Sequence, residues 1–479
     1  MIDPKDNAYL WIVIVGFIIA FILAFGIGAN DVANSFGTSV GSKVLTLLQA
    51  CIVASIFELA GAILIGSKVT DTIRKGIIKI DSFNGTEQLA MAGALSALTG
   101  TSVWLLIATF LNLPVSGTHS IVGATIGYAL VALGKSGIIW IELGKIAASW
   151  VISPLLSGII SSLIFTGIDK FILKSADPLI SGLFSLPFML GATLLINLFS
   201  IVYSNSDAFG LKMFCWWHIL LMCLGVALLC AILVRVFFNP WLKRKIISAD
   251  EAKASYQFTN TKEKVLFDNS GVELTFAGSK ERSHSTRSVV SYVADIMVQP
   301  KETEQLNHDD PCSAQLFKYL QILTATFGSF AHGGNDVSNA IGPLISLWLI
   351  YETGKVSGKA QTPIWILLFG GVGIVIGLCV WGRRVIKTIG ENLTPITPSS
   401  GFAIEIGSAL TVLLASNLGI PISTTHCKVG SIVMVGRVRS REVVDWSLFG
   451  GIVISWIVTM PITGGISAGV FAIVRAAIK

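Results

Sequence analysis

The stretch GANDVANSFG at residues 28–37 returns as GGNDVSNAIG at residues 333–342, an offset of 305 positions. Later in each half, LPVSGTHSIVG at 113–123 returns as IPISTTHCKVG at 420–430, an offset of 307 positions. Motifs that recur in the same order at nearly the same offset indicate one ancestral unit used twice. The fold must therefore contain two related halves.

The composition around these motifs is that of a membrane protein. Of the 479 residues, 53% are hydrophobic and only 13% are charged, and the mean hydropathy is +0.75. A soluble domain carries about 25% charged residues, so this chain has too few charges to cover a water-exposed surface. We therefore expect an all-α polytopic membrane protein that contacts a lipid bilayer, which excludes a cytosolic enzyme and a nucleic-acid-binding module.

The seven cysteines are scattered, without a CxxC or a paired His/Cys spacing. We therefore expect neither a disulfide framework nor a zinc site, and no catalytic arrangement or cofactor motif is visible. The formal net charge of +6 gives no reason to expect a nucleic-acid partner.

Apolar stretches of about 20 residues are long enough to cross a bilayer as helices. The chain contains about twelve, at 9–28, 46–66, 90–111, 119–134, 140–167, 184–203, 213–238, 318–341, 363–381, 401–418, 422–436 and 446–474. Grouped by the repeat, they predict a first repeat over 1–167, linking transmembrane helices over 168–239, a largely disordered cytoplasmic loop over 240–315 and a second repeat over 316–479.

The orientation of the spans follows from the polar loop, which opens with three basic residues at 243–245. If that loop is cytoplasmic, the preceding spans put the N-terminus outside, although several basic residues near position 74 fit this poorly. The sequon Asn84-Gly85-Thr86 then lies outside, where glycosylation of Asn84 is possible. The first copy begins outside and the second inside, so the copies form an inverted-topology repeat, which is typical of secondary transporters.

The first motif pair predicts two cation sites. Asp31 follows an apolar span, and a carboxylate at membrane depth is costly unless it holds a cation or lines water. Asn30 precedes Asp31, and Asn34 shares its helix face. Glycine and asparagine favour a helix break, which would free backbone carbonyls. Such an oxygen cage suits sodium, and the second copy supplies the same set: Asn335, Asp336 and Asn339. The alternative is a capped helix end without an ion.

The second motif pair predicts two anion sites. Each segment has a proline and then small or hydroxyl residues at the start of a new apolar helix, where free N–H groups and the helix dipole attract anions. The residues are Ser116, Gly117 and Thr118 in the first copy and Ser423, Thr424 and Thr425 in the second. Each segment can form a re-entrant hairpin whose tip approaches the midplane. The alternative is an ordinary N-cap between two helices.

Together the two kinds of site predict coupling. A phosphate dianion near Asp31 and Asp336 would be repelled unless cations bind with it, so neither ion binds well alone. Glu58, Glu405 and His332 also lie in apolar surroundings. The two glutamates are candidates for a further cation or a proton, and His332 for anion contact or a response to pH. Purely structural roles remain the alternative for all three.

At these residues the chain resembles the inorganic phosphate transporter (PiT) family, and most of all the animal type III sodium–phosphate cotransporters. The resemblance includes the stretches TPITPSSGF at 394–402 and FGSFAHGGNDVSNAIGPL at 327–344. It covers roughly 9–245 and 315–478, and leaves the central loop out.

This resemblance implies sodium-driven uptake of inorganic phosphate across the plasma membrane by an inverted-repeat fold, often as a homodimer. Carried onto this chain, it makes the asparagines and aspartates of both ND motifs sodium ligands, and Ser116, Thr118, Ser423, Thr424 and Thr425 phosphate contacts. It also gives Glu58 and Glu405 a role in transport. The open alternatives are proton-coupled transport of phosphate or another oxyanion, and a phosphate sensor or receptor with low flux.

Overall fold

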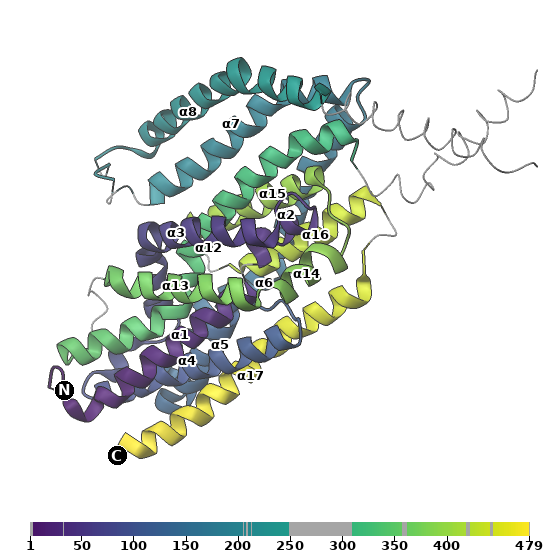
Figure 1. The fold of residues 1–479 in the computed structure, drawn as a ribbon. Helices are drawn as coiled ribbons and strands as arrows, with labels where there is room; N and C mark the ends of the chain where they lie inside the picture. The colour runs from purple at the N-terminus through teal and green to yellow at the C-terminus, as the bar shows by residue number, and fades with distance from the viewer. Residues whose placement is uncertain are drawn as a thin grey trace, which may run out of the picture.

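The computed structural model describes residues 3–31, 33–204, 206, 209–211, 213–248, 309–356, 362–417, 422–440 and 444–478. Every regular element within these ranges is a helix (Figure 1), which confirms the predicted all-α class. Most of the expected cytoplasmic loop, residues 249–308, lies outside the described residues.

The helices fall into a first set, a linking pair and a second set. The first set is α1 (Leu10–Asn30), α2 (Ala33–Gly41), α3 (Leu47–Gly76), α4 (Glu87–Phe110), α5 (Gly117–Leu133) and α6 (Trp140–Ile168). The linking pair is α7 (Pro178–Ser204) and α8 (Trp216–Leu233). The second set is α12 (Pro311–Thr353), α13 (Ile364–Trp381), α14 (Arg383–Lys387), α15 (Pro398–Asn417), α16 (Thr424–Arg439) and α17 (Trp446–Ile478). Short 3₁₀ or π-helical turns lie at Asn7–Tyr9, Ile80–Phe83, Gly134–Gly137, Asp169–Leu173, Val234–Phe238 and Thr388–Asn392.

Ten helical segments in the described part of the chain are long and apolar enough to cross a membrane. They support a multi-pass protein. The spans predicted at 318–341 and 422–436 are helical but do not belong to the ten. The reasons are physical: α16 has only 16 residues, and α12 carries the polar ND motif in its middle. The total of twelve spans remains a prediction.

The helix contacts of one set recur in the other. Helix α3 packs along α12 as α1 packs along α13, and α5 packs against α17 as α16 packs against α6. Helix α4 likewise contacts α17, and α15 contacts α6. The linking helices α7 and α8 pair with each other at one edge of the molecule (Figure 1). These matched contacts agree with a duplicated fold.

Glycines of the ND motifs allow very close contacts between helices of the two sets. A Cβ atom on Gly28 would lie 1.9 Å from the carbonyl oxygen of Ile374, and one on Gly333 would lie 2.1 Å from that of Glu58. No side chain fits at such distances. Each ND motif therefore starts at a point where its helix touches the backbone of the other half.

The helix break predicted in both copies occurs only in the first. Helix α1 ends at Asn30 and α2 begins at Ala33, whereas α12 runs without interruption through the second motif. The prediction was wrong for the second copy because α12 keeps its backbone hydrogen bonds while it packs along α3. One carbonyl still loses its usual helical donor, because Pro343 has no N–H to offer Asn339.

Candidate functional site

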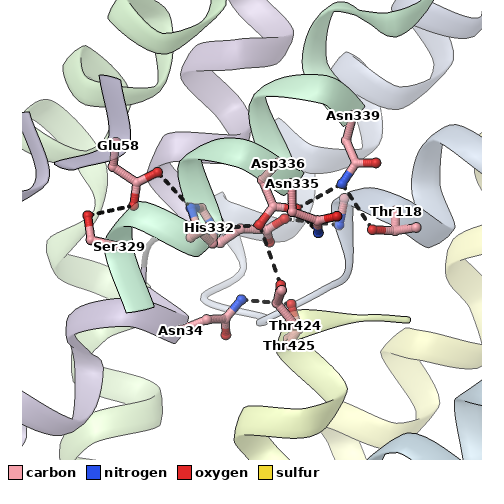
Figure 2. Close-up of polar contacts among 12 residues, drawn as sticks. Asn34, Glu58, Thr118, Ser329, His332, Asn335, Asp336, Asn339, Thr424 and Thr425 are labelled. Carbon is pink, nitrogen blue, oxygen red and sulfur yellow. Dashed lines mark hydrogen bonds and ion pairs between the residues drawn. The ribbon is translucent and has the colours of Figure 1, made fainter. Parts of the chain in front are cut away.

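The two ND motifs and the starts of α5 and α16 meet in the protein interior, and two crossed hydrogen bonds join them (Figure 2). The Nδ2 atom of Asn34 donates to Oγ1 of Thr425 over 2.9 Å. The Nδ2 atom of Asn339 donates to Oγ1 of Thr118 over 3.0 Å. Each asparagine therefore reaches the helix start of the opposite copy, and segments from both halves of the chain form one site.

The two aspartates contact the helix starts of their own copies. The backbone N–H of Gly117 donates to Oδ2 of Asp31 over 3.0 Å. The hydroxyl of Thr424 donates to Oδ2 of Asp336 over 3.5 Å. Both aspartates are only 1% exposed. The structure thus brings the predicted acidic residues to the predicted anion sites.

The serines at the two helix starts act as N-caps. Oγ of Ser116 accepts the N–H of His119 over 3.3 Å, and Oγ of Ser423 accepts the N–H of His426 over 3.2 Å. A serine that accepts with its oxygen keeps its hydroxyl hydrogen as a donor. The N-cap interpretation and an anion site are therefore compatible. The imidazole rings of the same two histidines lie 4.4 Å apart between centroids, so the helix starts meet side by side.

Three oxygen atoms around the aspartates are buried and have no hydrogen-bond partner among the described residues: Oδ1 of Asp31, Oδ1 of Asn34 and Oδ1 of Asn339. Buried acceptors of this kind normally have a partner. Carboxylate and amide oxygens are hard ligands that suit alkali and alkaline-earth cations. Among the described residues, no group of three or more His, Cys, Asp or Glu side chains that could hold a metal is found.

The other two asparagines of the motifs have different surroundings. Asn30 donates to Oγ1 of Thr109 over 3.1 Å and to the carbonyl of Leu113 over 2.9 Å, and its Oδ1 accepts the N–H of Val115 over 3.0 Å. It therefore ties the end of α1 to the segment before α5. Asn335 is half-buried and donates to Oδ1 of Asp336 over 3.3 Å.

His332 and Glu58, both singled out from the sequence, form a chain that leads to Asp336 (Figure 2). Nδ1 of His332 lies 2.9 Å from Oε2 of Glu58, and its Nε2 lies 2.7 Å from Oδ2 of Asp336. Ser329 donates to the other oxygen of Glu58 over 3.1 Å. The imidazole thus bridges two carboxylates that lie on different helices.

Glu405 lies apart from this chain, across a cavity that His332, Asn34 and Thr424 also line. Its carboxylate accepts hydrogen bonds from four neutral groups: Thr38 over 2.6 Å, Ser39 over 2.8 Å, Gln321 over 3.3 Å, and Thr324. Sequence reasoning missed these partners and Ser329. Only Thr38 and Ser39 carried a signal, because they directly follow the first ND motif.

Asn84 is not brought to the site. It lies exposed in the turn between residues 80–83 and α4. An exposed turn is accessible to modification, and glycosylation of Asn84 remains a prediction.

Comparisons with known proteins identify the family of the chain. The profile of the Phosphate transporter family matches residues 27–467. Sodium-dependent phosphate transporter 2 of Xenopus tropicalis is 42% identical over 98% of this chain and 98% of the relative. The human protein of the same name gives the same values. Sodium-dependent phosphate transporter 1-B of Xenopus laevis is 40% identical over 98% of this chain and 96% of the relative.

A solved structure described as the sodium-dependent phosphate transporter superimposes with a TM-score of 0.76. It is 33% identical, and the match covers 97% of this chain and 99% of the other. The resemblance inferred from the sequence motifs is thereby confirmed.

Proposed function

The chain belongs to the phosphate transporter family, and from this premise we propose that it is a sodium-coupled symporter that imports inorganic phosphate across the plasma membrane. The observation that carries the proposal is the pair of crossed contacts, Asn34 to Thr425 and Asn339 to Thr118. Through them, one buried site holds ligand atoms for a cation beside donors for an anion. It is a carrier and not an enzyme.

Sodium ions are the cations that this site transports. The unpartnered oxygens of Asp31, Asn34 and Asn339 are the first ligands that a sodium ion would meet, and Asp336 supplies the second acidic group. The hydrogen bonds of Asn30 to its neighbours favour a positioning role for that residue, and Asn335 supports Asp336. No resident cofactor is needed for this chemistry.

Phosphate binds between the two helix starts. Free N–H groups and the dipole of a helix N-terminus attract anions, and hydroxyl groups add donors for a tetrahedral oxyanion. The six contributing residues are Ser116, Gly117, Thr118, Ser423, Thr424 and Thr425. In the structure the hydroxyl of Thr425 also donates to the carbonyl of Val115 over 3.2 Å.

Coupling arises from the charges in the buried site. Asp31 and Asp336 repel phosphate, and the repulsion between charges is strong where water is excluded. Sodium ions at the carboxylates cancel this repulsion, so sodium raises the affinity for phosphate and phosphate raises the affinity for sodium. This reciprocal dependence makes the protein a symporter and prevents a sodium leak.

Alternating access follows from the repeat. We propose twelve spans, with α5 and α16 as the inner arms of two re-entrant hairpins, and two inverted copies over 1–167 and 316–479. Residues 168–239 link the copies, and 240–315 form a cytoplasmic loop. The family resemblance further supports a homodimer, and the exposed turn at Asn84 supports glycosylation on the outer side.

A proton-coupled carrier of phosphate or another oxyanion is the second candidate. The bridge that His332 forms between Glu58 and Asp336 favours it, because a proton could occupy that chain. A phosphate sensor with low flux would bind phosphate without concentrating it.

Uptake into liposomes separates these functions. The purified chain is reconstituted, and uptake of labelled phosphate is measured at fixed pH while sodium is titrated against choline. We expect concentrative uptake that needs sodium and rises steeply with its concentration. Uptake that persists in choline would support the proton-coupled carrier, and saturable phosphate binding without concentrative uptake would support the sensor.

A further inference from the structure

Lys428 breaks the symmetry between the two helix starts. It lies on α16, one helical turn after Thr424, whereas the first copy has Ile121 at the equivalent position. The lysine side chain is only 6% exposed. Within the described part of the chain, no side chain or carbonyl forms a hydrogen bond or a close ion pair with its ammonium group.

A buried ammonium group is costly to desolvate unless something compensates its charge. Lys428 lines a cavity, which we call the Lys428 cavity, together with Asn34, Thr324, His332, Glu405 and Thr424 among others. The ammonium group therefore borders open space inside the protein. An ammonium group carries three donors, which are available to an anion in that space.

Glu405 balances the charge of Lys428 from a distance. The carboxylate is 3% exposed and already accepts hydrogen bonds from four neutral donors, among them Thr38 and Thr324. It stabilises a positive charge in the cavity without occupying the donors of Lys428. This arrangement is suited to an anion that enters the cavity and displaces water from the ammonium group.

Thr424 links the Lys428 cavity to the central site. Its hydroxyl reaches Asp336, and the same residue lines the cavity. It is also the first residue of α16, a helix of 16 residues, so the dipole of that helix favours an anion at this point. The geometry places a helix N-terminus and an unpaired ammonium group one turn apart on the same face.

We propose that the Lys428 cavity is a second phosphate station, in which Lys428 and Thr424 hold the anion beside the central site. The inference rests on the proposed function, because it gives the transported phosphate an additional stop. The first copy has no ammonium group at the equivalent position, so the station serves only one of the two access routes. The two openings of the carrier therefore differ in their affinity for phosphate.

The test compares Lys428→Met, which removes the charge, with Lys428→Arg, which keeps it. Methionine is close to lysine in length, and the equivalent position of the first copy holds the apolar Ile121. Lys318→Gln is the control, because Lys318 is an exposed lysine on α12. The full chain is reconstituted in liposomes, and the half-saturating phosphate and sodium concentrations of uptake are measured. Equilibrium binding of labelled phosphate in detergent at fixed sodium gives a readout that does not depend on flux.

We expect Lys428→Met to raise the half-saturating phosphate concentration by about tenfold or more, which corresponds to a lost charge-assisted hydrogen bond. The half-saturating sodium concentration of Lys428→Met should stay within about twofold of the parent value. The half-saturating phosphate concentration of Lys428→Arg should remain within about threefold of the parent value, because the charge persists. Lys318→Gln should match the parent. Binding in detergent should weaken by the same factor as uptake.

An unchanged half-saturating phosphate concentration in Lys428→Met would overturn the proposal. A raised half-saturating sodium concentration with unchanged phosphate affinity would also overturn it. In that case Lys428 would affect the binding of the cation and would not hold the anion. If Lys428→Met fails to fold, a phosphate affinity of Lys428→Arg below a tenth of the parent value would also overturn it. Failure of the proposed function is a separate result, seen as absent sodium-driven uptake in the parent chain.

Discussion

Asp31 and Asp336 come from the same repeated motif, yet their surroundings differ. We call them, with their contacts, the first and the second acidic corner. Asp31 accepts one hydrogen bond from the protein, the N–H of Gly117, and its Oδ1 has no partner among the described residues. Asp336 has four neighbours, namely Asn335, Asn339, Thr424 and His332. The protein surrounds the second carboxylate with more polar partners than the first. The two copies of the motif therefore hold their carboxylates in unequal surroundings.

The difference comes from individual substitutions in otherwise repeated segments. Where the second copy has His332, the first copy has Ile27, and where it has Lys428, the first has Ile121. Both isoleucines are fully buried. An imidazole thus contacts Asp336 directly, whereas the equivalent residue beside Asp31 is apolar, and we expect Asp31 to bind sodium more tightly than Asp336.

The largest effect should follow the loss of either carboxylate. Removing one partner of a buried charge pair costs about 3 kcal/mol or more, which corresponds to about a hundredfold loss. Asp31→Asn and Asp336→Asn should each lower sodium-driven uptake of labelled phosphate about a hundredfold, with normal surface expression. Asp31→Asn should raise the half-saturating sodium concentration more than Asp336→Asn, because Oδ1 of Asp31 has no hydrogen-bond partner among the described residues.

The exposed Asp81 offers a control for this pair. Asp81→Asn should transport like the parent chain. Equal sodium affinities in Asp31→Asn and Asp336→Asn, or full activity in both, would remove the basis for two unequal sites.

A somewhat smaller effect should follow the loss of the histidine bridge. His332→Gln cannot contact Glu58 and Asp336 at once, and a hydrogen bond to a charged group contributes about 1.5 to 3 kcal/mol. We expect the half-saturating sodium concentration of uptake to rise by about thirtyfold. His218→Gln, on the linking helix α8, should leave it unchanged. A shift no larger than that of the control would mean that the bridge does not shape the second corner.

The crossed contacts should give effects of similar size in both copies. Thr118→Val and Thr425→Val each remove one acceptor from a buried asparagine amide, and a buried N–H left without an acceptor costs about 1 to 3 kcal/mol. The half-saturating phosphate concentration should rise about tenfold in each. Serine at either position keeps the hydroxyl and should stay close to the parent. If only one valine variant were impaired, the contacts would not be equivalent.

The smallest effect should come from Ser329, whose uncharged hydroxyl donates a single hydrogen bond to Glu58 over 3.1 Å. Such a bond contributes about 0.5 to 1.5 kcal/mol, so Ser329→Ala should lower the uptake rate about threefold. Ser136→Ala, at an exposed position, serves as the control. A loss as large as that of His332→Gln would show that Ser329 does more than orient Glu58.

Most of the site could be predicted from the sequence because its residues lie in repeated motifs. Both aspartates, Asn34, Asn339 and the two helix starts were identified in this way, and the structure brings them together. The partners of Glu405 were missed, because Gln321 and Thr324 belong to neither repeated motif. Their role depends on where α12 passes α15.

The fold was predictable to a similar degree. Hydropathy located the helices, since a bilayer requires long apolar segments. It could not show that α12 continues through its ND motif while α1 stops. Local glycine and asparagine content is almost the same in both copies, so only packing against α3 distinguishes them.

The amino-acid sequence by itself determined the membrane class, the duplication and the kinds of atoms available for ions, because these depend on composition and on residue order. Tertiary structure alone decided whether each side chain contacts its own copy or the other one. Asn34 and Thr425 are separated by 391 positions and still form a hydrogen bond. No periodicity encodes such a contact, because it depends on the rotation that relates the two halves. The same holds for the unequal surroundings of Asp31 and Asp336, which exist only once the helices have packed.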